Sequence, residues 1–217
     1  MADEKPSSQI VVIGSSAGGI DALTRLVATL PEHLPAPVVV AQHLDPNRAS
    51  HLHEILASRS TLPVVTVSDT EQMEPGTVYL IPPNHNVEII DGSVRVQPDH
   101  SQPPLPSIDL LFTTAANSYG ENTIGVILTG MGNDGAAGGR DIKGAGGTIV
   151  IQNPETAAYP SMPLALAPTV VDIVANLETI GALIGELLAG AYPLHQPEED
   201  EQLRTLLDML RDRSGID

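Results

Sequence analysis

The chain has 217 residues, 41% of them hydrophobic, and its 27 acidic and 10 basic side chains give a formal net charge of −17. This charge repels nucleic acids and anionic membranes, so neither is expected as a partner. The absence of cysteine excludes disulfides, zinc–thiolate sites and cysteine nucleophiles. The polar N-terminus differs from a signal peptide, and the apolar stretch after it is too short to span a bilayer, so we expect a cytoplasmic protein.

The first apolar stretch predicts a strand that turns sharply into a helix. Residues 9–13 have the pattern of a buried strand, and a helical pattern begins at Gly18. Between them, residues 14–18 have the form G-x-S-x-G, in which the glycines permit a sharp turn that exposes a serine hydroxyl. Ser16 is therefore the candidate nucleophile and Ser15 the weaker candidate. The same residues also fit an ordinary strand–turn–helix whose small side chains allow close packing.

The chain then alternates predicted strands and helices. Apolar runs predict strands over residues 36–42, 62–67, 77–81, 123–129 and 148–152. Helical spacing predicts helices over residues 51–60, 107–119, 136–143 and 173–188. Alternating residues around an Asp-Gly turn predict a hairpin over residues 87–96. This order predicts an α/β fold, with a doubly wound, mostly parallel sheet, helices on both faces and an antiparallel β-hairpin.

Three of the predicted strands are followed by polar residues of complementary chemistry, Ser16, His43 and Asp134. The carboxyl ends of parallel strands meet at one edge of a sheet, so these residues can form a nucleophile, a base and an acid that orients the base. Backbone N–H groups near Ala17 and Met131 could bind an oxyanion. Taken singly, His43 also fits a capping or surface residue, and Asp134 a turn residue or helix N-cap. The other histidines lack metal-ligand placement, and we assign no metal site.

The third of these turns also supports a different interpretation. Gly130, Gly132 and Gly135 match the G-x-G-x-x-G fingerprint of dinucleotide-binding proteins, and Glu155 lies about 20 residues further on, where a ribose-binding acid would lie. The fingerprint normally follows the first strand of its unit, and here it comes late in the chain. A nucleotide-binding protein is therefore kept as an alternative.

Taken together, several segments resemble the catalytic domain of the chemotaxis protein-glutamate methylesterase, CheB. The matching segments run in order over about residues 9–190 and are residues 13–19, 41–44, 79–83, 106–109, 128–135 and 161–163. The resemblance implies that Ser16 is the nucleophile, His43 the base and Asp134 its orienting acid, with an oxyanion contact at the backbone of Met131. No metal or cofactor is implied.

The resemblance also implies a substrate and partners. The family hydrolyses γ-glutamyl methyl esters on the cytoplasmic helices of chemoreceptors, giving glutamate and methanol, and many members deamidate receptor glutamines. Arg48, Arg140 and Lys143 follow the turns of the site and could help an acidic chain to dock on an acidic receptor, although solvated helix positions explain them equally. A catalytically silent receptor-binding domain is a second alternative.

Two departures from the family pattern stand out. Ala17 replaces a threonine that often follows the nucleophile, so a hydroxyl that could orient the site is missing. Only eight residues precede the first strand, so we expect no control by an N-terminal receiver domain within this chain.

The expected organisation has three parts. Residues 1–8 are a disordered tail, residues 9–192 the methylesterase catalytic domain, and residues 193–217 an acidic linker and helix. Residues 203–217 resemble the opening helix of the receptor methyltransferase, CheR. We therefore expect a CheR-type methyltransferase as a fused or associated partner, with this chain as the front of such a fusion.

Overall fold

The computed structural model describes residues 7–44, 50–97, 105–192 and 197–214, and in the last range the side chains of residues 205–213. The strands are β1 (Ile10–Ser15), β2 (Val38–Gln42), β3 (Val64–Thr66), β4 (Thr70–Gln72), β5 (Val78–Leu80), β6 (Val87–Ile90), β7 (Ser93–Val96), β8 (Thr123–Ile127), β9 (Thr148–Gln152) and β10 (Ile173–Ala175). The helices are α1 (Gly19–Val27), α2 (Leu52–Ala57), α3 (Ile108–Tyr119), the 3₁₀ turn η1 (Gly120–Asn122), α4 (Ala136–Gly144), α5 (Ser161–Leu164), α6 (Leu177–Leu188) and α7 (Pro197–Ser214).

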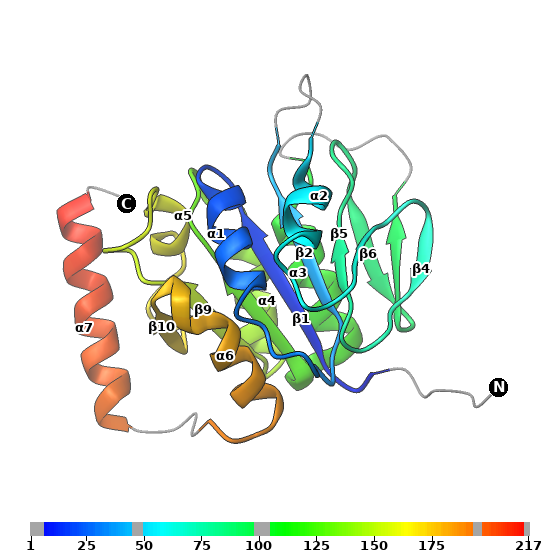
Figure 1. Ribbon diagram of the computed structural model, residues 1–217. Coiled ribbons are helices and arrows are strands. Elements are labelled where there is room, and N and C mark those ends of the chain that lie inside the picture. Colours follow the sequence, from blue (N-terminus) through cyan, green and yellow to red (C-terminus); the bar gives the residue numbers. More distant parts are fainter. Residues whose placement is uncertain (1–6, 45–49, 98–104, 193–196, 215–217) are drawn as a thin grey trace.

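Within the described residues, the strands form a seven-stranded sheet in the order β10-β9-β8-β1-β2-β5-β3, parallel at every pairing, and a separate three-stranded antiparallel sheet in the order β4-β7-β6 (Figure 1). This arrangement confirms the predicted doubly wound α/β fold. The chain first builds outward from β1 to β2, and later returns to the other side of β1 with β8. The carboxyl ends of β1, β2 and β8 therefore flank the switch point where ligands bind in such sheets.

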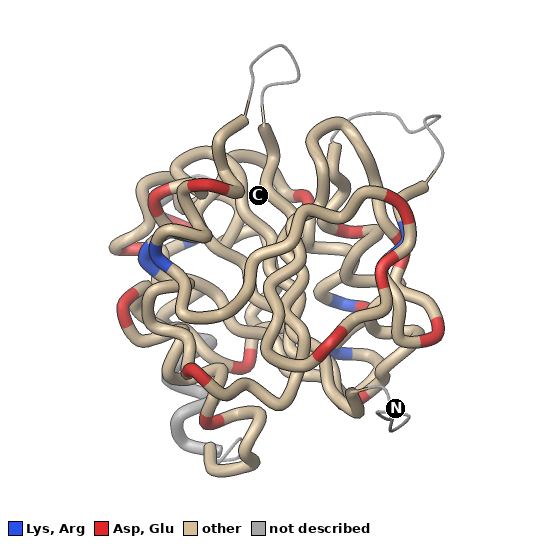
Figure 2. Tube along the Cα trace, turned by 45° about the vertical axis from the view of Figure 1, so that its right-hand side comes forward, with Lys and Arg blue, Asp and Glu red and all other residues tan. Residues whose placement is uncertain are grey.

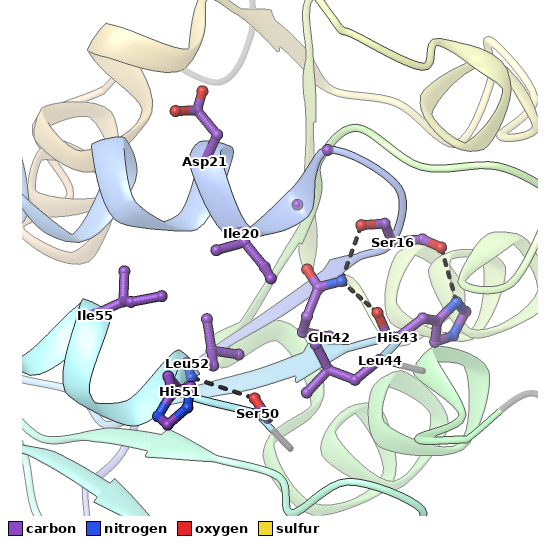
Figure 3. A pocket seen from close by; sticks show the side chains of 12 residues that line it. Ser16, Ile20, Asp21, Gln42, His43, Leu44, Ser50, His51, Leu52 and Ile55 are labelled. Carbon is purple, nitrogen blue, oxygen red and sulfur yellow. Dashed lines mark hydrogen bonds between the residues drawn. The ribbon is translucent and has the colours of Figure 1, made fainter. Parts of the chain in front are cut away.

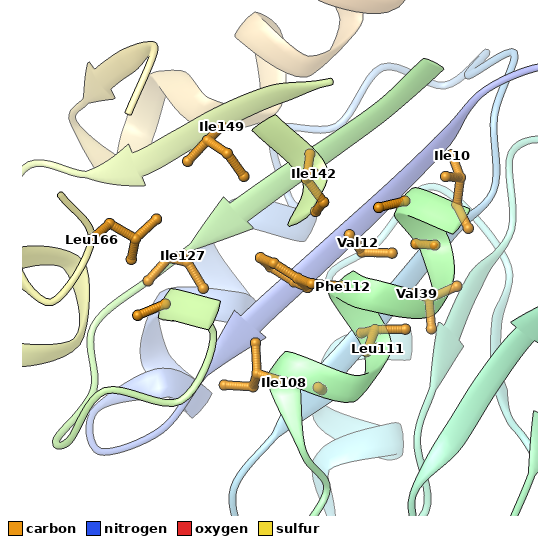
Figure 4. Close-up of a cluster of buried hydrophobic side chains, with 14 of the residues drawn as sticks. Ile10, Val12, Val39, Ile108, Leu111, Phe112, Ile127, Ile142, Ile149 and Leu166 are labelled. Atoms are coloured by element: carbon orange, nitrogen blue, oxygen red, sulfur yellow. The ribbon is translucent and has the colours of Figure 1, made fainter. Parts of the chain in front are cut away.

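The sheet is buried on both faces because its strands are rich in valine and isoleucine. Along β1, Ile10 and Val12 join a core cluster with Phe112 of α3 (Figure 4). Val11 and Ile13 join a second cluster with residues of α1, α2 and α6. Figure 1 shows α1 and α6 on the near face and α3 and α4 on the far face. The strand ends are thereby fixed from both sides.

The structure differs from the sequence prediction in four places. The single helix predicted over residues 173–188 is a short strand, β10, followed by α6, because Ile173–Ala175 pair with β9 at the sheet edge. Neither β4 nor α5 is predicted from the sequence. The predicted hairpin, β6–β7, belongs to the separate small sheet and packs on α3, where Ser118 Oγ donates to the Ile89 carbonyl at 2.8 Å.

Within the described part of the chain, no helix is both long enough and apolar enough to cross a membrane.

Candidate active site

The nucleophile candidate lies in the turn between β1 and α1. The backbone N–H of Ser16 donates to the Thr129 carbonyl at 3.1 Å, which ties this turn to the end of β8. Gly18 has a φ of 75°, a left-handed conformation that favours glycine at the start of α1. The adjacent Ser15 is fully buried and its hydroxyl donates to Oε1 of Gln42 at 2.7 Å, so it does not face the site.

His43 connects the serine to the acid. Its Nδ1 lies 3.2 Å from Ser16 Oγ, and its Nε2 lies 2.9 Å from Asp134 Oδ2. A carboxylate can only accept, so the proton of a neutral imidazole belongs on Nε2. The lone pair of Nδ1 then faces the serine hydroxyl (Figure 3). The structure thus brings together the three residues that the sequence placed at separate strand ends.

The carboxylate of Asp134 is held at the N-terminus of α3. Oδ2 accepts from the backbone N–H of Ile108 at 2.8 Å, and Oδ1 accepts from that of Asp109 at 2.9 Å. Burial raises the pKa of Asp134, but hydrogen bonds from His43 and from these two N–H groups outweigh it and hold the pKa below the ordinary value. The acid is therefore kept ionised beside His43.

The side chain of Asp109 in turn binds the chain directly after Asp134. Its Oδ1 accepts from the backbone N–H groups of Gly135 at 2.9 Å and Gly138 at 2.8 Å, at the N-terminus of α4. The start of α3 therefore binds the carboxylate of the loop before α4, and the start of α4 binds a carboxylate of α3. Burial and the charge of Asp134 raise the pKa of Asp109 against the effect of its hydrogen bonds. A Cβ at position 138 would lie 2.7 Å from the Asp109 carbonyl oxygen, so this close approach requires a glycine.

These contacts argue against the nucleotide-binding alternative. A pyrophosphate would need the free N–H groups at the start of α4, but those of Gly135 and Gly138 are bound to Asp109. The charges of Asp109 and Asp134 would also repel it. Glu155 lines a different hollow, together with Leu210 of α7.

Gln42 is a positioning residue that the sequence analysis missed. Its Nε2 donates to the backbone carbonyl of Ser16 at 2.9 Å and to that of His43 at 2.6 Å, while its Oε1 accepts from Ser15. One buried amide thus links the two turns that carry the nucleophile and the base. The sequence signals were a polar residue at the end of a buried strand, directly before His43, and its place in the matching segment 41–44.

The two expected oxyanion donors, the backbone N–H groups of Ala17 and Met131, are not used in the hydrogen bonds of the described residues. The loop that carries Met131 is anchored one residue earlier, since the N–H of Gly130 donates to the Tyr159 carbonyl at 3.0 Å and its carbonyl accepts from Met162 N–H at 3.1 Å. The side chain of Met131 is 62% exposed.

Ser16 and His43 also line a cavity of about 570 Å³ (Figure 3). No described residue of α7 lines it, so the described part of the tail helix does not cover the site. Instead, Leu207 and Leu210 of α7 are buried in the core cluster that contains Phe112 of α3. Arg211 Nε also donates to the Leu164 carbonyl at 3.0 Å. Among the described residues there is no group of three or more histidine or acidic side chains suited to a metal ion.

The basic residues expected to help docking fall into three situations. Arg48 lies outside the described residues. Lys143 pairs with Asp172. It lies near the C-terminal end of α4, and because α4 begins at the site, Lys143 is at the end of the helix that is far from the site. Arg140 is exposed on α4. Figure 2 shows acidic positions widely spread along the chain and few basic ones.

Comparison with known proteins gives a consistent result. A family model described as CheB methylesterase matches residues 11–184. A relative from Leptospira interrogans is 38% identical over 181 residues, which are 81% of this chain and 92% of that protein. Relatives from Thermotoga maritima and Carboxydothermus hydrogenoformans, both named protein-glutamate methylesterase/protein-glutamine glutaminase, are 38% and 39% identical and match 72% and 74% of this chain. The chain spans about half the length of these two, 47% and 49%.

A solved structure gives the same result for the fold. The crystal structure of the Thermotoga maritima CheB methylesterase catalytic domain is similar with a TM-score of 0.76 and 36% sequence identity. The similarity covers 82% of this chain and 98% of that one.

The hydrogen bonds that join Asp109 and Asp134 to the starts of α4 and α3 predict a graded effect of substitutions at Asp109. Asp109→Ala should lower kcat for an activated ester such as p-nitrophenyl acetate by about 10- to 100-fold, because the loop after Asp134 loses its anchor. Asp109→Asn keeps an acceptor oxygen and should recover most of the rate. The matched control is Asp141→Ala, since Asp141 also bridges α3 and α4, accepting from Thr113 Oγ1 at 2.6 Å on an exposed surface. An equal loss in Asp141→Ala would contradict a role at the site.

The lowered pKa of Asp134 predicts how stability depends on pH. Its folded-state pKa lies below the unfolded value of about 3.9, so its ionised form stabilises the fold fully above that value. This contribution is lost as the pH falls through the folded-state pKa. Urea unfolding of the wild type and Asp134→Asn from about pH 6 to about pH 3 should show a stability difference that shrinks in acid. A difference that is constant with pH would contradict this.

Proposed function

The chain belongs to the CheB methylesterase family, and we propose that it hydrolyses methyl esters of glutamate side chains on chemoreceptors. The observation that carries this proposal is the continuous hydrogen-bonded chain from Ser16 through His43 to Asp134 beside an open cavity. The substrate assignment is supported by the printed names of the relatives, protein-glutamate methylesterase/protein-glutamine glutaminase.

In the proposed reaction, Ser16 Oγ attacks the ester carbonyl while His43 Nδ1 accepts the hydroxyl proton. Asp134 stays ionised and stabilises the imidazolium through Nε2. The N–H groups of Ala17 and Met131 hold the oxyanion of the tetrahedral intermediate. When this intermediate collapses, the C–O bond to the methoxy group breaks and the proton on Nδ1 passes to the leaving group, which departs as methanol.

The second half of the reaction repeats these steps with water. The γ-glutamyl ester of Ser16 is attacked by a water molecule that gives a proton to His43 Nδ1, and the second tetrahedral intermediate returns this proton to Ser16 Oγ. The products are free glutamate and the original enzyme. A glutamine substrate would follow the same route with ammonia as the leaving group, so we include deamidation in the proposal. Neither reaction requires a metal or cofactor.

The partners and the location extend the proposal. We assign the cytoplasmic helical region of a methyl-accepting chemoreceptor as the substrate and the cytoplasm as the compartment. We assign residues 9–192 to the catalytic domain and residues 193–217 to a linker and helix leading toward a CheR-type methyltransferase. Support for the last assignment comes from the resemblance of residues 203–217, and α7 leaves Leu206 and Met209 of this segment exposed. A full-length reading frame without methyltransferase sequence after Asp217 would contradict it.

Methanol release from a methylated receptor cytoplasmic fragment tests the proposed nucleophile. Ser16→Ala should lower the rate by at least about 10³-fold, because the covalent route is removed. Ser15→Ala is the matched control, since its hydroxyl only anchors Gln42, and the loss of one hydrogen bond should cost about tenfold at most. A wild-type rate that survives in Ser16→Ala would contradict the proposal, and so would an equal loss in both variants.

A further inference from the structure

The cavity beside the candidate triad extends well beyond the reacting atoms. Ser16 and His43 lie at one end, and Ile20 of α1 with Leu52 and Ile55 of α2 surround the other (Figure 3). Its volume of about 570 Å³ is that of a site for a drug-sized ligand, and one esterified glutamate side chain leaves much of it unfilled. A substrate whose ester reaches Ser16 must therefore place something else in the rest of the cavity.

The far end of the cavity is apolar and open. Ile20 is 40% exposed and Ile55 is 36% exposed, although most large aliphatic side chains of the described chain are buried. Leu52 and Ile55 are three residues apart on α2 and so share one helix face, which they turn toward Ile20. Water in contact with these side chains is released when an apolar group binds, and this release favours an apolar occupant.

The charges around the cavity distinguish between possible occupants. Among the described lining residues, Asp21 is the one carboxylate, and neither lysine nor arginine is present. Among these described residues, an acidic neighbour of the esterified glutamate would find neither a lysine nor an arginine, and His51 already has Glu54 as a neighbour, with 4.0 Å between Nδ1 and Oε2. Asp21 has Arg25 as a neighbour, with 3.6 Å between their charged atoms, but Arg25 also pairs with Glu178, so binding of a basic substrate residue near Asp21 is an outcome that the test below distinguishes.

We propose that Ile20, Leu52 and Ile55 form a specificity subsite that binds an apolar side chain of the substrate, one helical turn from the esterified glutamate. The subsite rests on the proposed function, because it assumes a helical protein substrate. Residues three or four apart on a helix project about 5–6 Å from each other on the same face, so the ester and the apolar side chain can enter one cavity together. The subsite selects among receptor glutamates by the residue beside each of them.

The test compares a protein substrate with a small one. For each variant, kcat/KM is measured for methanol release from a methylated receptor fragment and for hydrolysis of p-nitrophenyl acetate, which carries no neighbouring side chain. Ile55→Glu should lower the ratio of the two kcat/KM values by about tenfold or more, mainly through KM for the receptor. Ile55→Leu should keep the ratio near that of the wild type, because it preserves the apolar surface.

Ile90→Glu is the matched control, since Ile90 is another isoleucine that is 37% exposed, on β6 of the separate small sheet. It should leave the ratio unchanged. An Ile55→Glu ratio that is unchanged contradicts the subsite, and a ratio that rises contradicts it in favour of a basic occupant. Absence of Ser16-dependent methanol release in the wild type would instead contradict the proposed function, and the subsite with it.

Discussion

The arrangement of the site depends on one carboxylate, that of Asp134, held between the N-terminus of α3 and the imidazole of His43. Its two oxygens accept from Ile108 N–H, Asp109 N–H and His43 Nε2 at 2.8–2.9 Å. The positive end of the helix dipole and these donors stabilise the ionised form more than burial opposes it. An ionised Asp134 fixes the imidazole tautomer, and the tautomer decides that Nδ1 can accept the proton of Ser16.

The same carboxylate also takes part in the hydrogen bonds that link the two helices behind the sheet. Asp109 gives its backbone N–H to Asp134 and uses its side chain to bind the start of α4, so neither helix can move without disturbing the acid. Glycine at position 138 permits the close approach. On the other side of the site, Gln42 links the turns of Ser16 and His43. The parallel sheet brings the three strand ends together, and these buried polar contacts set the final distances.

The sequence predicted those features that depend on local patterns. Strand 148–152 and the helix beginning near residue 107 follow from short-range rules, and in the structure Ser107 Oγ caps this helix by accepting from Leu110 N–H at 3.1 Å. Ser16, His43 and Asp134 could be placed at one sheet edge because each follows a predicted strand. The side-chain contacts of Asp109 could not be predicted, since they depend on how α3 packs against the start of α4 and no strand end marks this residue. A three-residue strand such as β10 is also indistinguishable from the first turn of a helix.

The ring orientation of His43 provides the most direct test of this account. In a sample with ¹⁵N-labelled histidine at neutral pH, the His43 signals are those that disappear in His43→Gln. The account predicts that the neutral form of the ring carries its proton on Nε2, and that this proton signal changes in Asp134→Ala, because the hydrogen bond to Asp134 is lost. A proton on Nδ1, or a signal that is insensitive to Asp134, would show that the acid does not hold the base toward Ser16.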